Sequence, residues 1–229
     1  MRFDLVVERL ANLPDPLPAA ASVLTPVVVG SDQELRTRDG PPPGRPGRPA
    51  GVLALIYPDD EGFARIFLTE RASGDGHHSG EVSFPGGAAE SEDADIAATA
   101  LREAAEEVAL DAAAAGVQVV ARLERFWIPV SDFEVHPIVA VAARRPELVA
   151  SPAEVARIVE PRLDRFVPAA PIVIVERTIG DWPLRFGAFD VDGLTLPGLL
   201  KLICAPGGKT IVTFPAFGKL NVILPELLV

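Results

Sequence analysis

Three glutamates in the segment AATALREAAEEVAL, residues 97–110, have a spacing that could bind a metal ion. They are Glu103, Glu106 and Glu107, and positions i, i+3 and i+4 are neighbours on the surface of a helix. Like charges at this spacing each cost a helix about 0.2–0.5 kcal/mol. A divalent cation that prefers oxygen ligands, such as Mg²⁺ or Mn²⁺, would turn this repulsion into attraction. The pattern therefore indicates chemistry on an anionic substrate.

The same acidic stripe is also typical of a solvated helix face in an acidic protein. The loop before the helix favours the metal site, because Gly86 and Gly87 allow backbone N–H groups to approach phosphate oxygens or form a sharp turn. Arg102 stands beside Glu103, where it could pair with a carboxylate and fix its rotamer. It could equally be an ordinary surface arginine.

Strands and a few further helices are expected to position this helix. Helical spacing of apolar residues predicts helices over 2–11 and 95–110, and we also expect a short helix over 152–160. Strand patterns occur at 51–57, 63–70, 118–128 and 133–142, and a late hairpin is expected from 171–179 and 183–189. Strands mixed with helices favour an α/β protein with a mixed sheet between helices.

The helix and its preceding loop resemble the signature of the Nudix hydrolase family. Residues 102–110, REAAEEVAL, match the second half of that signature, and Gly87 matches its first glycine. Ala104 and Ala109 depart from it, and the spacing from Gly87 to Arg102 is one residue longer. Asp93 falls at the early glutamate position, which Glu92 or Asp95 could fill instead.

This resemblance implies a Nudix-like α/β/α sandwich with a mixed β-sheet and hydrolysis of a diphosphate linkage in a small nucleotide. It also implies catalytic roles for Arg102 and for the three helix glutamates. Glu103, Glu106 and Glu107 would hold Mg²⁺ or Mn²⁺, and Glu103 is the first candidate for the general base.

The longer spacing is similar to that of the coenzyme A pyrophosphatase branch of the family. Residues 69–87, TERASGDGHHSGEVSFPGG, also resemble the upstream pattern of that branch, but Asp75-Gly76 replaces a Leu-Arg pair and Glu81 a glutamine. Similar residues continue downstream at 127–129, 131, 133, 135, 137–139 and 154–156. The substrate-binding residues that the resemblance implies are Arg71, His78, Phe84, Gly86 and Gly87.

The resemblance covers residues 50–193 and predicts that they form the hydrolase domain. Residues 1–49 are expected to be an N-terminal helix and a Pro/Gly-rich linker. Residues 194–229 are apolar and interrupted by Pro and Gly, without the closing helix usual in relatives. Such a segment is either a divergent end of the same domain or part of a homodimer interface.

The composition of the chain limits the kinds of partner that the protein could bind. The net charge of −11 and the lack of a Lys/Arg cluster exclude binding to nucleic acid through phosphates. No apolar run reaches the ~20 residues of a membrane span, so we expect no membrane partner. The single cysteine, Cys204, fits a reducing cytoplasm and a place in the core.

Three functions follow from the sequence. The leading hypothesis is metal-dependent hydrolysis of coenzyme A or acyl-coenzyme A. The second is hydrolysis of another nucleoside diphosphate derivative, such as ADP-ribose, a dinucleotide or a nucleoside triphosphate. The third is a Nudix-fold binding or regulatory module without turnover, which the three intact helix glutamates disfavour.

Two other side-chain patterns have ordinary explanations. A zinc site at His77-His78 is disfavoured because no spaced Cys or His supports it. Trp127 could stack on an adenine, but a single tryptophan in a strand is more typical of packing.

Overall fold

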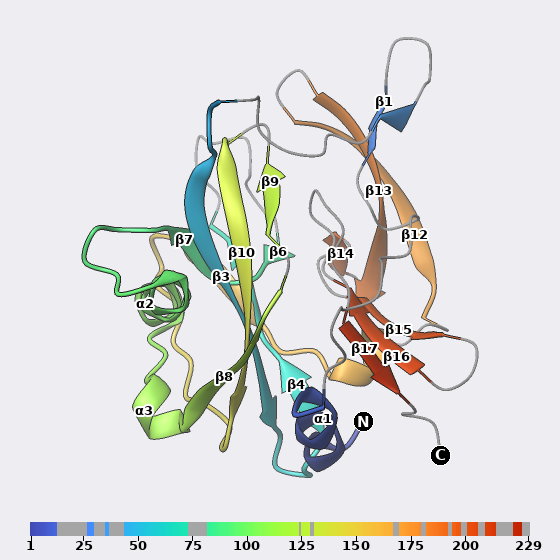
Figure 1. Ribbon diagram of the computed structural model, residues 1–229. Helices are drawn as coiled ribbons and strands as arrows, with labels where there is room; N and C mark the ends of the chain where they lie inside the picture. The colour runs from blue at the N-terminus through green and yellow to red at the C-terminus, as the bar shows by residue number, and fades with distance from the viewer. Residues whose placement is uncertain are drawn as a thin grey trace.

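The computed structural model describes most of the first two thirds of the chain and parts of the remainder (Figure 1). The described residues are 1–12, 27–29, 35–36, 44–72, 82–123, 125–128, 131–166, 170–179, 182–191, 194–197, 201–205, 209–213 and 222–225.

A mixed sheet of six strands forms the centre of the molecule. Strand β3 (Arg48–Pro58) runs parallel to β10 (Phe133–Ala142), with His136 opposite Gly51. Both strands are almost continuously apolar beyond their first residues, as expected for strands covered on both faces. The other members pair antiparallel to these two: β4 (Ala64–Ile66), β7 (Gly86–Ala88), β8 (Val117–Arg122) and β9 (Phe126–Ile128).

Helix α2 (Ile96–Val108) lies on one face of this sheet, followed by the short α3 (Ala112–Ala115) (Figure 1). Asp95 caps α2 by accepting hydrogen bonds from the N–H groups of Ala97 and Ala98. The helix approaches β3 closely, since a Cβ added to Gly51 would lie 2.7 Å from the Ile96 carbonyl oxygen. Small buried residues make this approach possible: Ala97, Ala100 and Ala104 pack with Leu53, Leu55 and Ile138.

The opposite face is covered by helix α1 (Phe3–Leu10), the 3₁₀ turn η2 (Leu163–Phe166) and a second sheet. That sheet contains β12 (Ile172–Ile179), β13 (Trp182–Val191), β14 (Leu194–Pro197), β1 (Val27–Val29) and β2 (Leu35–Arg36). Phe189 of β13 is buried edge-to-face against Phe166. Helical elements therefore lie on both faces of the mixed sheet, which confirms the predicted α/β class.

A third, three-stranded sheet corrects one sequence prediction. Residues 152–160 were expected to form a short helix, but β11 (Val155–Val159) pairs with β5 (Leu68–Arg71), which pairs with β6 (Val82–Ser83). The run VARIV is rich in β-branched residues, and its pairing with β5 outweighs the local helical spacing.

Two predicted strands are each divided in the structure. Residues 63–70 separate at Phe67, which is fully buried, so that β4 and β5 join different sheets. Residues 118–128 separate into β8 and β9 around buried Leu123. The predicted late hairpin is confirmed by the antiparallel pairing of β12 with β13.

The tail that the sequence left unassigned contributes β14 and a separate antiparallel sheet. This sheet consists of β15 (Lys201–Ala205), β16 (Lys209–Thr213) and β17 (Val222–Pro225). Within the described part of the chain, no helix has both the length and the apolar character required to cross a membrane.

Candidate functional site

The turn that carries Gly86 and Gly87 lies directly against the glutamates of α2. A Cβ added to Gly87 would lie 2.5 Å from the Glu103 carboxyl carbon, so this carboxylate occupies the space that a side chain would fill. A Cβ added to Gly86 would lie 2.3 Å from the Gly51 carbonyl oxygen, because the turn also pairs with β3. Both glycines are therefore required for the close approach of strand, turn and helix.

Glu107 is a partly buried acid of the site. Burial raises its pKa to about 7, although the N–H of Gly86 donates a hydrogen bond to its carboxylate and opposes the shift. The negative charges of Glu103 and Glu154 raise the pKa further, and Arg71 lowers it. The hydroxyl of buried Thr69 lies 3.4 Å from Glu107 Oε2 and can donate to it.

Glu103 shares this environment. Burial raises its pKa, the adjacent Arg102 lowers it, and Glu106 and Glu154 raise it again. The charge of Glu103 thus acts on the partly buried carboxylate of Glu107. Such a pair is stabilised by a cation.

Arg102 holds the acidic side chains on the outer side of the helix. Its guanidinium contacts Asp93 Oδ1 at 3.0 Å, Glu103 Oε1 at 3.0 Å and Glu106 Oε2 at 3.1 Å, and it donates to the Ala88 carbonyl oxygen at 2.9 Å. The sequence left open whether Arg102 was only a surface residue. The structure shows that it connects the loop to the helix.

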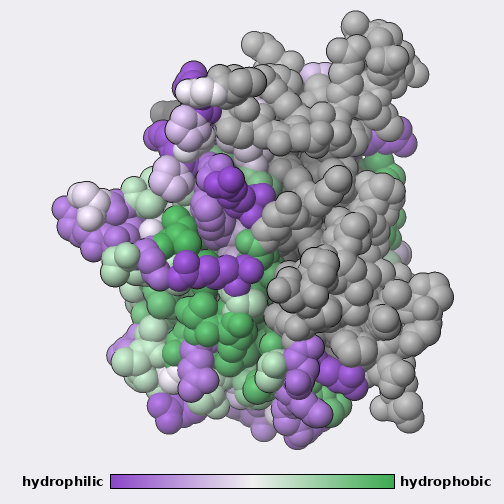
Figure 2. All heavy atoms as spheres, viewed as in Figure 1, coloured by the Kyte–Doolittle hydropathy of each residue, from purple (hydrophilic) through white to green (hydrophobic). Residues whose placement is uncertain are grey.

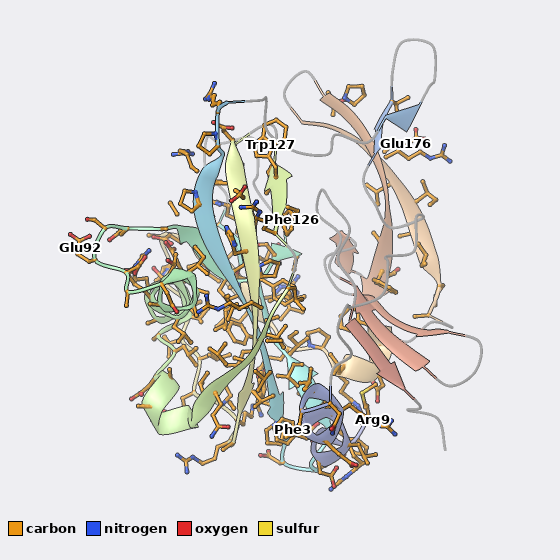
Figure 3. The ribbon with its side chains drawn as sticks, viewed as in Figure 1. Phe3, Arg9, Glu92, Phe126, Trp127 and Glu176 are labelled. Atoms are coloured by element: carbon orange, nitrogen blue, oxygen red, sulfur yellow. The ribbon has the colours of Figure 1, made fainter. Side chains whose placement is uncertain are left out.

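Of the three acids considered for the early acidic position, Asp93 is the one that pairs with Arg102. Its pKa lies well below the usual range because Arg102 donates to it, and it also accepts hydrogen bonds from the Glu90 N–H and the Thr99 hydroxyl. The two alternatives have other places. Asp95 caps α2, and Glu92 points into solvent from the loop between β7 and α2 (Figure 3). Figure 2 shows hydrophilic surface over this loop.

The acidic side chains are oxygen donors of the kind that a divalent cation prefers, but they are not grouped around one common position. Among the residues that the structure describes, no three His, Cys, Asp or Glu side chains are grouped closely enough to hold a metal ion. Arg102 accounts for this, because it draws Glu103 and Glu106 toward its guanidinium. The oxygen donors and the raised pKa values of Glu103 and Glu107 fit Mg²⁺ or Mn²⁺, once the carboxylate of Glu103 turns away from Arg102.

The remaining predicted site residues have varied positions. Arg71 ends β5 and is near enough to Glu107 to affect its pKa electrostatically. Phe84 is buried in the core, where it anchors the glycine turn. His78, like His77, lies outside the described residues. Trp127 is buried and donates from Nε1 to Asp132 Oδ1 at 3.0 Å, which favours packing over the alternative of adenine stacking.

Sequence reasoning assigned no role to two residues of this site. Thr69 and Glu154 both fell within the family-like segments, yet nothing in their local sequence indicates contact with α2. They reach the site because β11 pairs with β5 beside the helix. No local signal distinguished Thr69, which is one of three polar residues in the run FLTER.

Replacement of Gly87 by Ala is expected to lower turnover by roughly 10- to 100-fold, because the new methyl group displaces the Glu103 carboxylate. The unfolding free energy should change by less than about 1 kcal/mol, since a flexible side chain can move. Gly86→Ala is the contrasting variant, because its methyl group meets the backbone of β3 and should destabilise the fold by about 1–3 kcal/mol. Urea unfolding and hydrolysis rates of both variants test this. Wild-type turnover in Gly87→Ala would contradict it.

Comparison with known proteins agrees with this geometry. Residues 47–168 match the NUDIX domain family. Nudix hydrolase 15, mitochondrial, of Arabidopsis thaliana is 38% identical over 120 residues, which are 52% of this chain and 41% of that protein. An uncharacterized Nudix hydrolase NudL of Pectobacterium atrosepticum is 41% identical over 99 residues, 43% of this chain and 50% of the relative. The chain thus spans half or less of the length of these curated relatives.

Similar solved structures include a Nudix hydrolase from M. smegmatis, RenU. It has a TM-score of 0.44 and 22% identity, and the match covers 61% of this chain and 80% of that one. At this level of similarity we draw no conclusion from it. The family match spans more than half of the chain and includes the glycine turn, Arg102 and the helix glutamates. The chain therefore belongs to the Nudix domain family.

Proposed function

We propose that this protein is a metal-dependent hydrolase that cleaves the diphosphate linkage of coenzyme A or acyl-coenzyme A. The observation that carries the proposal is the desolvated pair Glu103 and Glu107 beside the turn of Gly86 and Gly87. Carboxylates arranged in this way need a cation, and a cation held by oxygen ligands suits an anionic diphosphate. The branch-like residues between 69 and 87 favour coenzyme A over other nucleotides.

Glu103, Glu106 and Glu107 are the proposed metal ligands. A bound Mg²⁺ or Mn²⁺ would neutralise charge on the diphosphate and lower the pKa of a bound water. Arg102 would orient Glu103 and Glu106 until a cation draws Glu103 away from it, and Gly86 and Gly87 allow strand, turn and helix to approach closely. Glu103 is the proposed general base, because its carboxylate adjoins the glycine turn and its raised pKa suits proton transfer.

The reaction adds one water across the P–O–P linkage. The water oxygen bonds to one phosphorus, the bridging P–O bond breaks, and the leaving phosphate takes the electron pair. Coenzyme A would yield a phosphopantetheine product and adenosine 3′,5′-bisphosphate. Glu103 would accept the proton of the attacking water and later return it to solvent.

The replacement of the branch's Leu-Arg pair by Asp75-Gly76 favours a second candidate function. A lost arginine removes a potential phosphate contact, so ADP-ribose, a dinucleotide or a nucleoside triphosphate could be the better substrate. A binding module without turnover is the third candidate. The retained glutamates of α2 disfavour it.

A product assay by mass spectrometry tests the proposal. The full chain would be incubated with Mg²⁺, and separately with Mn²⁺, in the presence of coenzyme A, ADP-ribose, NADH and nucleoside triphosphates. We expect adenosine 3′,5′-bisphosphate from coenzyme A to form faster than any other product. Faster turnover of another compound would change the proposed substrate but not the proposed active site. Binding of a compound without formation of any product would show that the protein is a binding module and not an enzyme.

Two further expectations belong to this proposal. The single cysteine supports an enzyme that works in the reducing cytoplasm. The apolar residues 194–229 support a homodimer, which sedimentation of the purified chain would detect.

A further inference from the structure

Thr99 is a buried polar residue near the start of α2. Its exposed fraction is 0%, and the other buried residues of the helix are alanines and one valine. Threonine forms helices less readily than alanine, and a buried hydroxyl without a partner destabilises a fold. The position is packed tightly against β3, since a Cβ added to Gly51 would lie 3.2 Å from the Cβ of Thr99. Packing alone therefore does not explain why a threonine stands here.

The hydroxyl of Thr99 donates to Asp93 Oδ2 at 2.8 Å. The same oxygen accepts from the Glu90 N–H at 2.9 Å, and the Asp93 side chain is only 7% exposed. Thr99 is stiff at χ1 because its Cβ is branched and lies against β3, so its hydroxyl has a defined direction. Two donors, one from the loop and one from the helix, thus hold the Asp93 carboxylate in one orientation.

Arg102 binds this carboxylate with two of its nitrogens. Its Nε donates to Asp93 Oδ1 at 3.0 Å, and its Nη2 donates to Asp93 Oδ2 at 3.2 Å and to the Ala88 carbonyl oxygen at 2.9 Å. A two-pronged pair of this kind fixes the plane of the guanidinium as well as its distance. The remaining nitrogen, Nη1, faces Glu103 at 3.0 Å and Glu106 at 3.1 Å. The orientation of Arg102 beside these glutamates therefore depends on how Asp93 is held.

We propose that Thr99 is a positioning residue of this site: its hydroxyl holds Asp93 so that Arg102 keeps one orientation. Thr99 itself touches no substrate, because it is fully buried. Its effect on turnover rests on the proposed function, whereas its effect on Arg102 does not. Without the hydroxyl, the loop alone would hold Asp93, and the guanidinium would follow the Glu103 carboxylate when this carboxylate turns. The ordinary alternative is a threonine that only joins the loop to the helix, which would contribute to stability and not to kcat.

Two readouts on the full chain test this inference. The first is the rate at which the Arg102 Nε–H exchanges with solvent in the metal-free protein, followed by NMR after assignment with Arg102→Lys. The second is kcat and KM for the preferred substrate at saturating Mg²⁺. We expect Thr99→Val, which keeps the shape of the side chain, to speed the exchange at least about tenfold. It should also lower kcat roughly tenfold and leave KM unchanged. Thr99→Ser keeps the hydroxyl and should restore both readouts.

Ser91→Ala is the matched control. It removes another 2.8 Å bond between a hydroxyl and a carboxylate in the same loop, but that bond joins Ser91 to the solvent-exposed Glu92. Both readouts should therefore stay at the wild-type values. Urea unfolding verifies that each variant is folded, and Thr99→Ala, which suits a helix, replaces Thr99→Val if the latter is not.

The outcomes separate this inference from the proposed function. Wild-type exchange of the Arg102 Nε–H in Thr99→Val would overturn the inference. A loss of stability with wild-type kcat would also overturn it and make Thr99 a structural residue, as would a loss of kcat that Thr99→Ser does not restore. If the wild type hydrolyses no compound, the proposed function fails, and faster exchange in Thr99→Val would still show that Thr99 controls Arg102.

Discussion

Glu107→Gln is expected to reduce turnover by roughly 10²- to 10⁴-fold, because a metal ion contributes several kcal/mol to a reaction of this kind. The substitution removes the charge of a partly buried acid and changes its shape very little. The amide oxygen can still accept the hydrogen bond from the Gly86 N–H. Hydrolysis of the preferred substrate at saturating Mg²⁺ is the measurement, since it separates lost catalysis from weak metal binding.

The control for this variant is its own stability. Glu107 is buried with a raised pKa, so its replacement by a neutral group should leave the metal-free protein at least as stable as the wild type at pH 8. A loss of turnover together with unchanged or higher stability would assign the effect to chemistry. Turnover within a few-fold of the wild type would mean that Glu107 does not hold the metal.

Local sequence was sufficient to predict the parts of the site that depend on neighbours in the chain. The helix over 95–110 was predictable from its apolar spacing, and Asp95 is a typical N-cap at its start. The glycine turn was predictable as a place of close approach because only glycine lacks a Cβ. The structure specifies what approaches: the Glu103 carboxylate at Gly87 and the β3 backbone at Gly86.

The parts that depend on distant residues were not predictable from local patterns. The sequence offered three acids for the early acidic position of the family signature. Only the folded loop shows that Asp93 reaches Arg102, while Asp95 caps the helix. The helix expected at 152–160 had plausible spacing, yet pairing with β5 makes it a strand. That error concealed Glu154, which directly precedes β11 and whose charge contributes to the raised pKa of Glu107.

The acidic site is also expected to control how stability depends on pH in the metal-free protein. Burial raises the pKa of Glu107 from 4.5 to about 7, so the folded state binds a proton more tightly than the unfolded state. The stability from this group is fully present below pH 4.5 and is lost as the pH rises toward 7. From pH 5 to pH 8 the wild type should therefore lose stability, by on the order of 3 kcal/mol at most from this residue.

Urea unfolding in EDTA at pH 5 and pH 8 measures this loss, with Glu107→Gln as the reference. All other titratable groups are common to both proteins and cancel in the difference. The acids with lowered pKa, such as Asp93 and Asp95, lose their contribution only at lower pH and lie outside this window. An equal change in both proteins would show that Glu107 is ordinarily solvated. Because a cation favours the ionised carboxylates, Mg²⁺ should stabilise the wild type more at pH 8 than at pH 5, and this pH dependence would link the desolvation of the site to its proposed use of a metal.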